Sequence, residues 1–442
     1  MKKLLYPLLA FAALAACTNN DFSELVVNTK PDTPQYDPNR RSYNEALEIA
    51  QNSINMLGSN DPTTRGAEPV RTINLKNGVK AYRQPVTRSN GTASTNDTLF
   101  YVFNFNDDQG FAVVSASRQT DGLIAVTESG YYDPSVPTGN PGFDTYMQMA
   151  KAYVAFKDRT PVEDEKVGGG TRYGPDQPMY MPEYDTVYYQ KVDPMITVRW
   201  GQQGRTGQYC PNGWAGCGPV AAAQIMSYFK YPPYIFLTYS DCGVDYTPLY
   251  WIPICNHQTT NVSYNRDEYD IEIGRLCRQL GELAGSNYDS NGTSTFITNM
   301  RNTIQSLGYT VGSITDYALS SYDGGYPLAT ALGNNKLIYM RGENSNNIGH
   351  AWVIDGCYYV KCNYNLMCSY DGVNWFLDHT MYTYRTCHNH INWGWDGRQN
   401  GYFESNVLNA YNSIQLDDPI NTLPSGLNRN YYNNVKYFTV TH

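Results

Sequence analysis

One cysteine in this sequence stands between two glycines, immediately before a helical pattern. Cys217 lies within GWAGCGPVAAAQIMSYF, in which Val220, Ile225 and Phe229 recur with helical spacing. The partial positive charge at a helix N-terminus lowers the pKa of a thiol, and the thiolate is the nucleophilic form of cysteine. We therefore predict that Cys217 is a nucleophile; the alternative is a buried structural cysteine ahead of a helix.

A histidine follows this cysteine at a distance that suits a cysteine–histidine pair. His350 begins an apolar run, Ala351–Ile354, and lies 133 residues after Cys217; in papain-type enzymes this separation is about 130 to 150 residues. An imidazole there can take the thiol proton and later return it to a leaving amine. The alternative is a structural histidine with no part in chemistry.

Two further segments carry residues that could assist such a pair. An asparagine such as Asn392 can accept an imidazole N–H and hold its tautomer, and Trp393 beside it can shield the pair from water. Their alternative is a turn-forming asparagine next to a core tryptophan. Gln202 lies 15 residues before Cys217, and its amide could donate to the oxyanion of a tetrahedral intermediate, although Gln203 competes for that role.

The first 17 residues are typical of an export signal. Lys2 and Lys3 precede the apolar run Leu4–Leu14, and small residues then lead to Cys17. The ending LAAC resembles the lipobox of bacterial lipoproteins, in which the cysteine is lipidated; the alternative is an ordinary signal peptide cut near Ala16. Both interpretations predict export, either as an outer-membrane lipoprotein anchored through Cys17 or as a protein secreted after maturation.

The rest of the chain divides into a small domain and a larger one. Residues 18–41 are rich in Asn, Asp, Thr and Pro and predict a flexible tether. Residues 42–158 predict a small α+β domain, because a capping box at Ser42 and Glu45 opens a helical pattern and three strand patterns and a second helical pattern follow. The strand patterns cover 98–105, 110–116 and 123–127, and the second helical pattern covers 143–156. Residues 159–191 are charged, then rich in Gly and Pro, and predict an exposed linker ahead of the working domain, 192–442.

The charge balance argues against nucleic acid as a partner. The chain has 41 acidic and 32 basic residues, a net charge of −9 and a pI near 5.2, whereas phosphate binding needs clustered Lys and Arg. Beyond the leader, no apolar run approaches the roughly 18 residues that a membrane span needs. We predict no cofactor.

Cysteines other than Cys17 and Cys217 number eight, and export allows them to form disulfides in any of 105 pairings. Cys277 lies in an amphipathic helical pattern and is predicted to be a core residue. A zinc site is the first rival hypothesis, because CHNH, residues 387–390, holds three possible ligands. Such a site would need a further ligand from His379 or Cys368, and we predict no metal.

Successive blocks of this sequence resemble the streptopain family of bacterial cysteine peptidases, which has a papain-like fold. The blocks are GC at 216–217, AAQIMSYFKYP at 222–232, GHAWVIDG at 349–356, and NWGW at 392–395 followed by GYF at 401–403. In the N-terminal domain, YVFNF at 101–105, GFAVVSA at 110–116 and GYYD at 130–133 resemble the inhibitory propeptide of the family.

This resemblance implies a papain-like α+β peptidase domain behind a propeptide that covers the cleft until the linker is cut. By its motifs, Cys217 is the nucleophile, His350 the general base and acid, and Gln202 the oxyanion donor. Asn392 and Trp393 are the orienting and shielding residues. The resemblance does not decide which of the two holds the imidazole. The implied partners are protein or peptide substrates and the chain's own propeptide as an intramolecular inhibitor.

The sequence departs from the family pattern in two places. Gly218 and Pro219 follow the cysteine where Val-Ala is expected, and the insert from Cys357 to Cys387 is longer than expected, which predicts a disulfide-tied loop near the cleft. Two other functions fit the same scaffold. They are a catalytically inactive surface lipoprotein that binds a ligand, and acyl transfer in which an amine replaces water.

Overall fold

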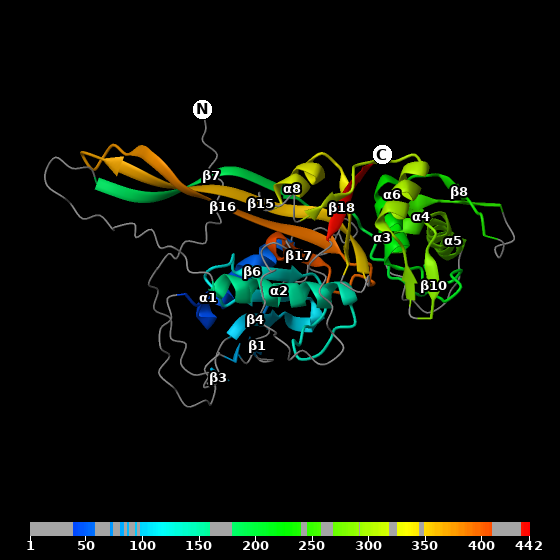
Figure 1. Cartoon of the computed structure of the whole chain (residues 1–442), viewed down its shortest axis with the longest axis horizontal. Helices are drawn as coiled ribbons and strands as arrows, with labels where there is room; N and C mark the ends of the chain where they lie inside the picture. The colour runs from blue at the N-terminus through cyan, green and yellow to red at the C-terminus, as the bar shows by residue number, and fades with distance from the viewer. Residues whose placement is uncertain are drawn as a thin grey trace. The chain divides into compact units, whose positions relative to one another are not determined.

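The structure is a computed structural model that describes most of the chain after residue 38 (Figure 1). The described residues are 39–57, 71–73, 80–83, 86–87, 93–94, 98–159, 179–239, 245–257, 268–290, 292–317, 325–343, 349–408 and 435–442. The predicted signal peptide, 1–17, and most of the predicted tether, 18–41, lie outside these ranges, as do Cys17 and Cys242.

The N-terminal domain is an antiparallel sheet with two helices, as the sequence predicts. Helix α1, Tyr43–Ser53, begins with the predicted capping box between Ser42 and Glu45. A 3-10 turn, η1 (Ile54–Leu57), follows it. The main strands are β4 (Thr98–Asn104), β5 (Phe111–Ser115) and β6 (Leu123–Thr127), with β1 (Lys80–Arg83) beside β4, a small β2–β3 pair (Val86–Thr87 and Ala93–Ser94) and η3 (Asn106–Asp108). Helix α2, Pro141–Arg159, covers the predicted 143–156 segment.

The sheet of the N-terminal domain continues into that of the C-terminal domain. Strand β6 pairs antiparallel with β17, Gly401–Glu404, and the order of the main path is β1-β4-β5-β6-β17-β16-β15-β14-β18-β12. The strands beyond β17 are β16 (Phe376–Asn392), β15 (Gly349–Ser369), β14 (Leu337–Glu343), β18 (Lys436–Thr441) and β12 (Thr310–Val311), with β13 (Thr315–Asp316) also on β18. The two domains therefore share one sheet.

The C-terminal domain also contains helices and small hairpins. The helices are α3 (Cys217–Phe229), α4 (Trp251–Asn256), α5 (Glu268–Leu283), α6 (Ile297–Ser306) and α8 (Tyr326–Gly333), and the hairpins are β8–β9 (Tyr234–Phe236 and Tyr246–Pro248) and β10–β11 (Asn287–Asp289 and Gly292–Ser294). A 3-10 turn, η6 (Ser405–Leu408), follows β17. The predicted helix after Cys217 is confirmed, and Cys277 is a fully buried core residue of α5.

The two faces of strands β14 and β15 belong to different cores. Tyr339 and Ala351 pack with the helices around α3, whereas their neighbours Met340 and Trp352 pack with α2 and the N-terminal domain. This follows from the alternation of side chains along a strand. One face of this sheet therefore packs in the core of the peptidase domain, and the other face packs against the N-terminal domain.

Two of the sequence predictions for irregular segments are wrong. Residues 179–191, assigned to the linker, belong to strand β7 (Met179–Val192), which pairs with β15 from Cys357 to Ser369. The long insert is not a disulfide-tied loop: its residues form the outer parts of β15 and β16, and all its cysteines are free thiols. Strands β7, β15 and β16 together make a three-stranded ribbon (Figure 1).

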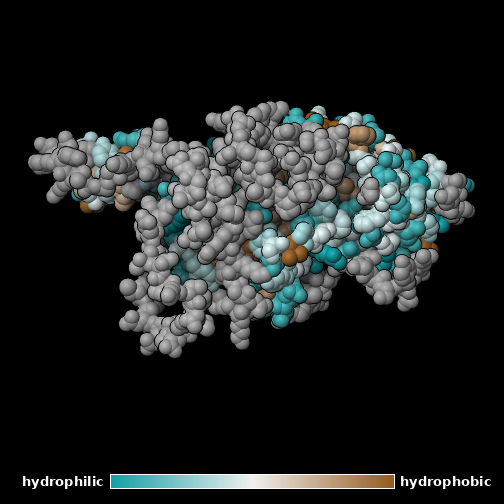
Figure 2. Space-filling view, turned by 60° about the horizontal axis from the view of Figure 1, so that its bottom comes forward, coloured by the Kyte–Doolittle hydropathy of each residue, from teal (hydrophilic) through white to brown (hydrophobic). Residues whose placement is uncertain are grey.

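The end of this ribbon carries exposed apolar side chains. Tyr370, Val373 and Phe376 are 71%, 79% and 59% exposed, and brown areas lie among teal ones at the left-hand end in Figure 2. The helical end, on the right of that view, is mostly teal and white. Among the described helices, none is long and apolar enough to cross a membrane.

Candidate active site

Cys217 is the first residue of α3, and its side chain is partly exposed. Gly216, with φ at 87°, occupies the left-handed region that favours glycine and turns the chain into the helix. Burial raises the pKa of the Cys217 thiol, but hydrogen bonds from His350 and from the N–H of Ala351, with the positive charges of His350 and Arg341, lower it to about 7. The thiolate is therefore a major form at neutral pH.

His350 is buried, only 4% exposed, and is the second residue of β15, where it pairs with Gly342 of β14. Its Nε2 lies 2.9 Å from the carbonyl oxygen of Trp393. A carbonyl only accepts hydrogen bonds, so Nε2 carries a proton and Nδ1 is left to bond the Cys217 thiol. The rings of Trp352 and Trp393 lie beside the imidazole, with centroids 6.2 and 6.4 Å away. The structure thus brings Cys217, His350 and Trp393 together.

Asn392 lies next to this group but bonds to other partners. Its Nδ2 donates to the carbonyl of Val198 over 2.9 Å, and its Oδ1 accepts from Gln224 Nε2 at 3.1 Å and from Gly394 N at 3.2 Å. The acceptor for the imidazole is therefore the main chain of Trp393, and Asn392 ties the turn after it to α3.

Gln202 is buried, and its backbone lies against the loop that leads to the cysteine. The N–H of Ala215, two residues before Cys217, donates to the carbonyl oxygen of Gln202 over 2.8 Å. The Trp214 ring from this loop meets Trp395 edge to face, with centroids 6.2 Å apart. Gln202 thus belongs to the segment that supports the cysteine loop.

The histidines of the rival zinc hypothesis have protein partners. His388 Nε2 lies 2.9 Å from the carbonyl of Leu123, and His390 is held between two carboxylates, those of Asp355 and Glu128. Within the described part of the chain, no group of three or more His, Cys, Asp and Glu side chains is placed to hold a metal ion.

The start of α2, in the N-terminal domain, packs directly on the imidazole. A Cβ added at Gly142 would lie 2.5 Å from His350 Cδ2 and 2.5 Å from Trp393 Cε3. Both domains also line an apolar pocket beside His350, with Tyr146 and Met149 on one side and Trp352 on the other. The N-terminal domain therefore covers the histidine of the pair.

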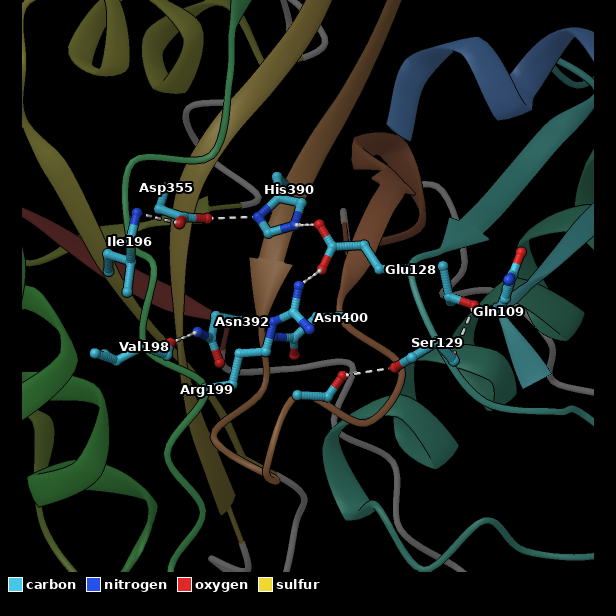
Figure 3. A network of polar contacts seen from close by, with 12 residues as sticks. Gln109, Glu128, Ser129, Ile196, Val198, Arg199, Asp355, His390, Asn392 and Asn400 are labelled. Carbon is cyan, nitrogen blue, oxygen red and sulfur yellow. Dashed lines mark hydrogen bonds and ion pairs between the residues drawn. The ribbon is translucent and has the colours of Figure 1, made fainter. Parts of the chain in front are cut away.

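A polar network also joins the same two domains (Figure 3). His390 Nδ1 lies 2.6 Å from Asp355 Oδ1, and its Nε2 lies 3.1 Å from Oε1 of Glu128, a residue of the N-terminal domain. Arg199 approaches the other oxygen of Glu128 at 3.3 Å. Burial lowers the pKa of His390, but the two carboxylates raise it to about 10, so the imidazole is charged. Burial raises the pKa of Glu128, but His390 and Arg199 lower it to about 2.

A second contact between the domains joins two carboxyl groups. Glu404 on β17 is fully buried and hydrogen-bonded to Asp121 of the N-terminal domain, and burial together with that neighbour raises its pKa well above the ordinary value. His388 Nε2 lies 3.5 Å from Glu404 Oε2, but burial lowers the pKa of His388 and favours its neutral form. The closed pair therefore holds a proton that the separated domains would release.

Sequence reasoning missed the acceptor carbonyl, the covering glycine and the buried carboxyl pair. Every residue has a main-chain carbonyl, so residue type does not show which carbonyl accepts from His350. Only the position of Trp393 after Asn392 could have indicated this acceptor. Gly142 was detectable only as a glycine next to a proline at a helix start. Glu404 and Asp121 are ordinary charged residues until the sheet pairing brings them together.

Two family models match the two domains of this chain. Residues 186–403 match the model of the Peptidase C10 family, and residues 39–154 match the model described as Spi protease inhibitor. Streptopain of Streptococcus pyogenes is 24% identical over 334 residues, which cover 70% of this chain and 74% of that protein. The streptopain of serotype M1 gives the same values. A solved fragment of prointerpain A from Prevotella intermedia is 19% identical with a TM-score of 0.49, over 82% of this chain and 98% of that one.

A cysteine and a histidine paired at a helix start, beneath a second domain that covers the histidine, define a papain-like cysteine peptidase with its own inhibitory domain. The chain belongs to the Peptidase C10 family, the streptopain family, and is a cysteine endopeptidase with an N-terminal inhibitory propeptide. The predicted resemblance and the predicted α+β fold are confirmed.

Substitution of Asn392 by alanine should reduce activity without abolishing it. The Trp393 carbonyl would still accept from His350, but the turn that carries it would lose its ties to Val198 and Gln224. We expect kcat/KM of the activated enzyme to fall by about tenfold to a hundredfold, with an unchanged pH optimum. A loss as complete as that of His350→Ala would mean that the amide itself holds the imidazole.

Substitution of Gly142 by alanine should loosen the propeptide over the site. The added methyl would overlap His350 and Trp393, and such overpacking costs about 1 to 3 kcal/mol. We expect the thiol of the uncleaved zymogen to react with an epoxide inhibitor about tenfold faster. Val136→Ala, at a position 59% exposed in the same domain, is the control, and equal rates for both variants would contradict the proposed overlap.

Docking of the N-terminal domain on the peptidase domain should also weaken as pH rises. The pKa of Glu404 is raised when the domains are docked, so docking takes up a proton. The contribution of Glu404 to docking is fully present below the ordinary carboxyl pKa and is lost as the pH rises past the raised value. The lowered pKa of Glu128 acts in the opposite direction, and its contribution is lost only as pH falls from the ordinary value toward about 2. Docking is therefore strongest in mild acid.

Glu404→Gln tests this linkage, because glutamine imitates the protonated acid at every pH. We expect the ratio of zymogen to activated-enzyme labelling rates to rise between pH 5 and 9 in the wild type and to rise less steeply in the variant. A residual rise is expected there because Glu128 of the N-terminal domain helps to raise the pKa of His390, which still titrates in the variant. Taking the ratio removes the titration of the Cys217 thiol itself. A wild-type ratio that falls with pH would reverse the proposed sign.

Proposed function

We propose that this chain is an exported endopeptidase made as a zymogen, in which Cys217 is the nucleophile and His350 the general base and acid. The observation that carries the proposal is the hydrogen bond between the Cys217 thiol and His350, whose other nitrogen is held 2.9 Å from the Trp393 carbonyl. The Cys217 thiol, whose pKa is lowered to about 7, can give its proton to the imidazole that is held beside it. A thiolate next to an imidazole that has taken up this proton is the pair that acyl transfer needs at the start.

The chemistry follows from these protonation states. The Cys217 thiolate attacks the carbonyl carbon of a peptide bond, and the proton already on His350 Nδ1 passes to the leaving amine. Water, deprotonated by the now neutral imidazole, then breaks the thioester and regenerates the thiolate. The N–H of Cys217, in the first helical turn, lacks an acceptor within the helix and is aligned with the helix dipole.

We assign to that N–H and to the Gln202 side chain the stabilisation of the oxyanion. Trp393 has two roles in this proposal: its carbonyl orients the imidazole and its ring shields the pair from water. Asn392 is a positioning residue that acts through the Trp393 turn. Protein or peptide substrates with a hydrophobic residue just upstream of the residue at the cut are the expected class.

Maturation by cleavage within residues 160–178 fits the fold. The segment joins the end of α2 to the start of β7, and the hydrogen-bonded backbone of those two elements resists proteolysis. After the cut, the two domains would still share an apolar core that includes Phe143 and Phe403. The propeptide then stays bound to the peptidase domain without a covalent link. In this proposal the chain is exported, either with Cys17 lipidated or as a protein that is secreted after maturation.

Cys217→Ala beside the wild type tests the proposal. Both zymogens are treated with an added protease and then with casein and with an epoxide that alkylates papain-like thiols. We expect the wild type to be labelled and to digest casein, and the variant to do neither. Cys277→Ala is the matched control, because Cys277 is also a helical cysteine but burial raises the pKa of its thiol, and it should behave as the wild type.

The remaining outcomes separate the other functions. A cleaved wild type that is neither labelled nor active would support a catalytically inactive binding protein. Labelling without hydrolysis, followed by release of a peptide amide when an amine is added, would support acyl transfer. Mass spectrometry of the mature N-terminus then fixes the cleavage position and reports whether the lipidated residue remains with the enzyme.

A further inference from the structure

A second cation lies beside the proposed nucleophile. Arg341 is on β14, directly opposite Ala351, whose N–H bonds the Cys217 thiol. Its side chain is only 7% exposed. A Cβ added at Gly349, the residue before His350, would lie 2.9 Å from Arg341 Nη2. The guanidinium is therefore buried against the strand that carries the histidine.

The register of β14 places this guanidinium on the same side of the sheet as the cysteine. Tyr339, two residues earlier and on the same face, has its hydroxyl 3.1 Å from a Cβ added at Gly218, the second residue of α3. Side chains at alternate positions of a strand share a face. Arg341 thus follows Tyr339 along the helix start, one step nearer to His350.

Among the side chains that the structure describes, the charged and titratable groups around Arg341 come from four elements. They are Cys217 on α3, His350 on β15, Tyr339 on β14 itself, and Lys436 on β18, which stands opposite Arg341 in the register. Lys436 is farther out, with a side chain that is 37% exposed and 3.7 Å from Asp316. Burial raises the pKa of Tyr339, the charge of Cys217 raises it further, and the charge of Arg341 lowers it. Cys217 and Arg341 therefore both lie close enough to Tyr339 to act on it electrostatically.

We propose that Arg341 is a positioning residue for the reaction, a fixed buried cation that stabilises the thiolate of Cys217 independently of His350. The inference rests on the proposed function, since it takes Cys217 as the nucleophile. An imidazolium loses its charge when it gives its proton to the leaving amine, whereas a guanidinium keeps its charge throughout. Arg341 therefore favours the thiolate as leaving group when water breaks the thioester.

Alkylation of Cys217 by iodoacetamide measures this effect directly. The reagent is neutral, so the charge of residue 341 does not attract or repel it, and it reacts with the thiolate form. Cys217 is partly exposed in the intact chain, so the full-length zymogen can be used. The rate is followed between pH 4 and 9 by mass spectrometry of the peptide that contains Cys217, which separates it from the other cysteines.

We expect Arg341→Gln to slow alkylation at pH 5 by about threefold to tenfold, which corresponds to a rise of about 0.5 to 1 unit in the pKa of the thiol. Arg341→Lys keeps the charge and should remain within about twofold of the wild type. Lys436→Gln is the matched control, a cation removed from the same face one strand away, and should have no effect. In a His350→Ala chain, Arg341→Gln should slow the reaction by the same factor.

Superimposable curves for Arg341→Gln and the wild type would overturn the inference and leave the role of Cys217 intact. Equal shifts for Arg341→Gln and Arg341→Lys would assign the effect to packing and also overturn it. A Cys217 thiol that titrates at an ordinary value in the wild type would instead contradict the proposed function. Far-UV circular dichroism of each variant shows whether it folds, and the lysine variant is informative if the glutamine variant does not.

Discussion

The pairing of β6 with β17 is the interaction on which the zymogen depends. Strand β17 ends the sheet of the peptidase domain, and an uncovered edge exposes a row of unpaired backbone groups. The propeptide supplies the missing neighbour through Thr127, Val126 and Ala125. The backbones approach so closely at Gly401 that an added Cβ would lie 2.2 Å from the carbonyl of Val126. With this register fixed, α2 lies across the sheet and its start meets His350.

Trp393 contacts the imidazole of His350 through two different groups. Its main-chain carbonyl orients the imidazole, and its ring shields the imidazole from water. The Trp393 carbonyl holds the imidazole, and this carbonyl is itself fixed because Trp393 N bonds Asn400 Oδ1 at 3.1 Å and its ring nitrogen bonds the Gln399 carbonyl at 3.0 Å. The ring is then free to pack against the imidazole. Asn392, one residue earlier, connects the same turn to α3, so cysteine and histidine are positioned through one turn.

Local sequence patterns were enough to predict the helices and strands that are specified by residues close together in the chain. The capping box at Ser42, the strands at 98–127 and the helix at Cys217 all follow from spacing and end signals. Strand β7 was missed because its partner residues on β15 follow it by more than 160 positions, and the charged, glycine-rich segment before it predicts a linker. Cys217 and His350 could be proposed from residue type and spacing, whereas the acceptor for the imidazole is a main-chain atom that no residue type encodes.

The same contacts that inhibit the enzyme also complete its fold, which constrains how activation can proceed. One apolar core contains Phe111 and Phe143 of the propeptide together with Phe403 and Trp393 of the peptidase. Cutting the linker removes only the covalent connection, because this core and the β6–β17 pairing are unaffected by a break at 160–178. Burial of each large aromatic side chain contributes about 1.5 to 3 kcal/mol, so separation needs a further step. Two steps are compatible with the structure, deprotonation of the Asp121–Glu404 pair and digestion of the propeptide itself, and only the first is reversible.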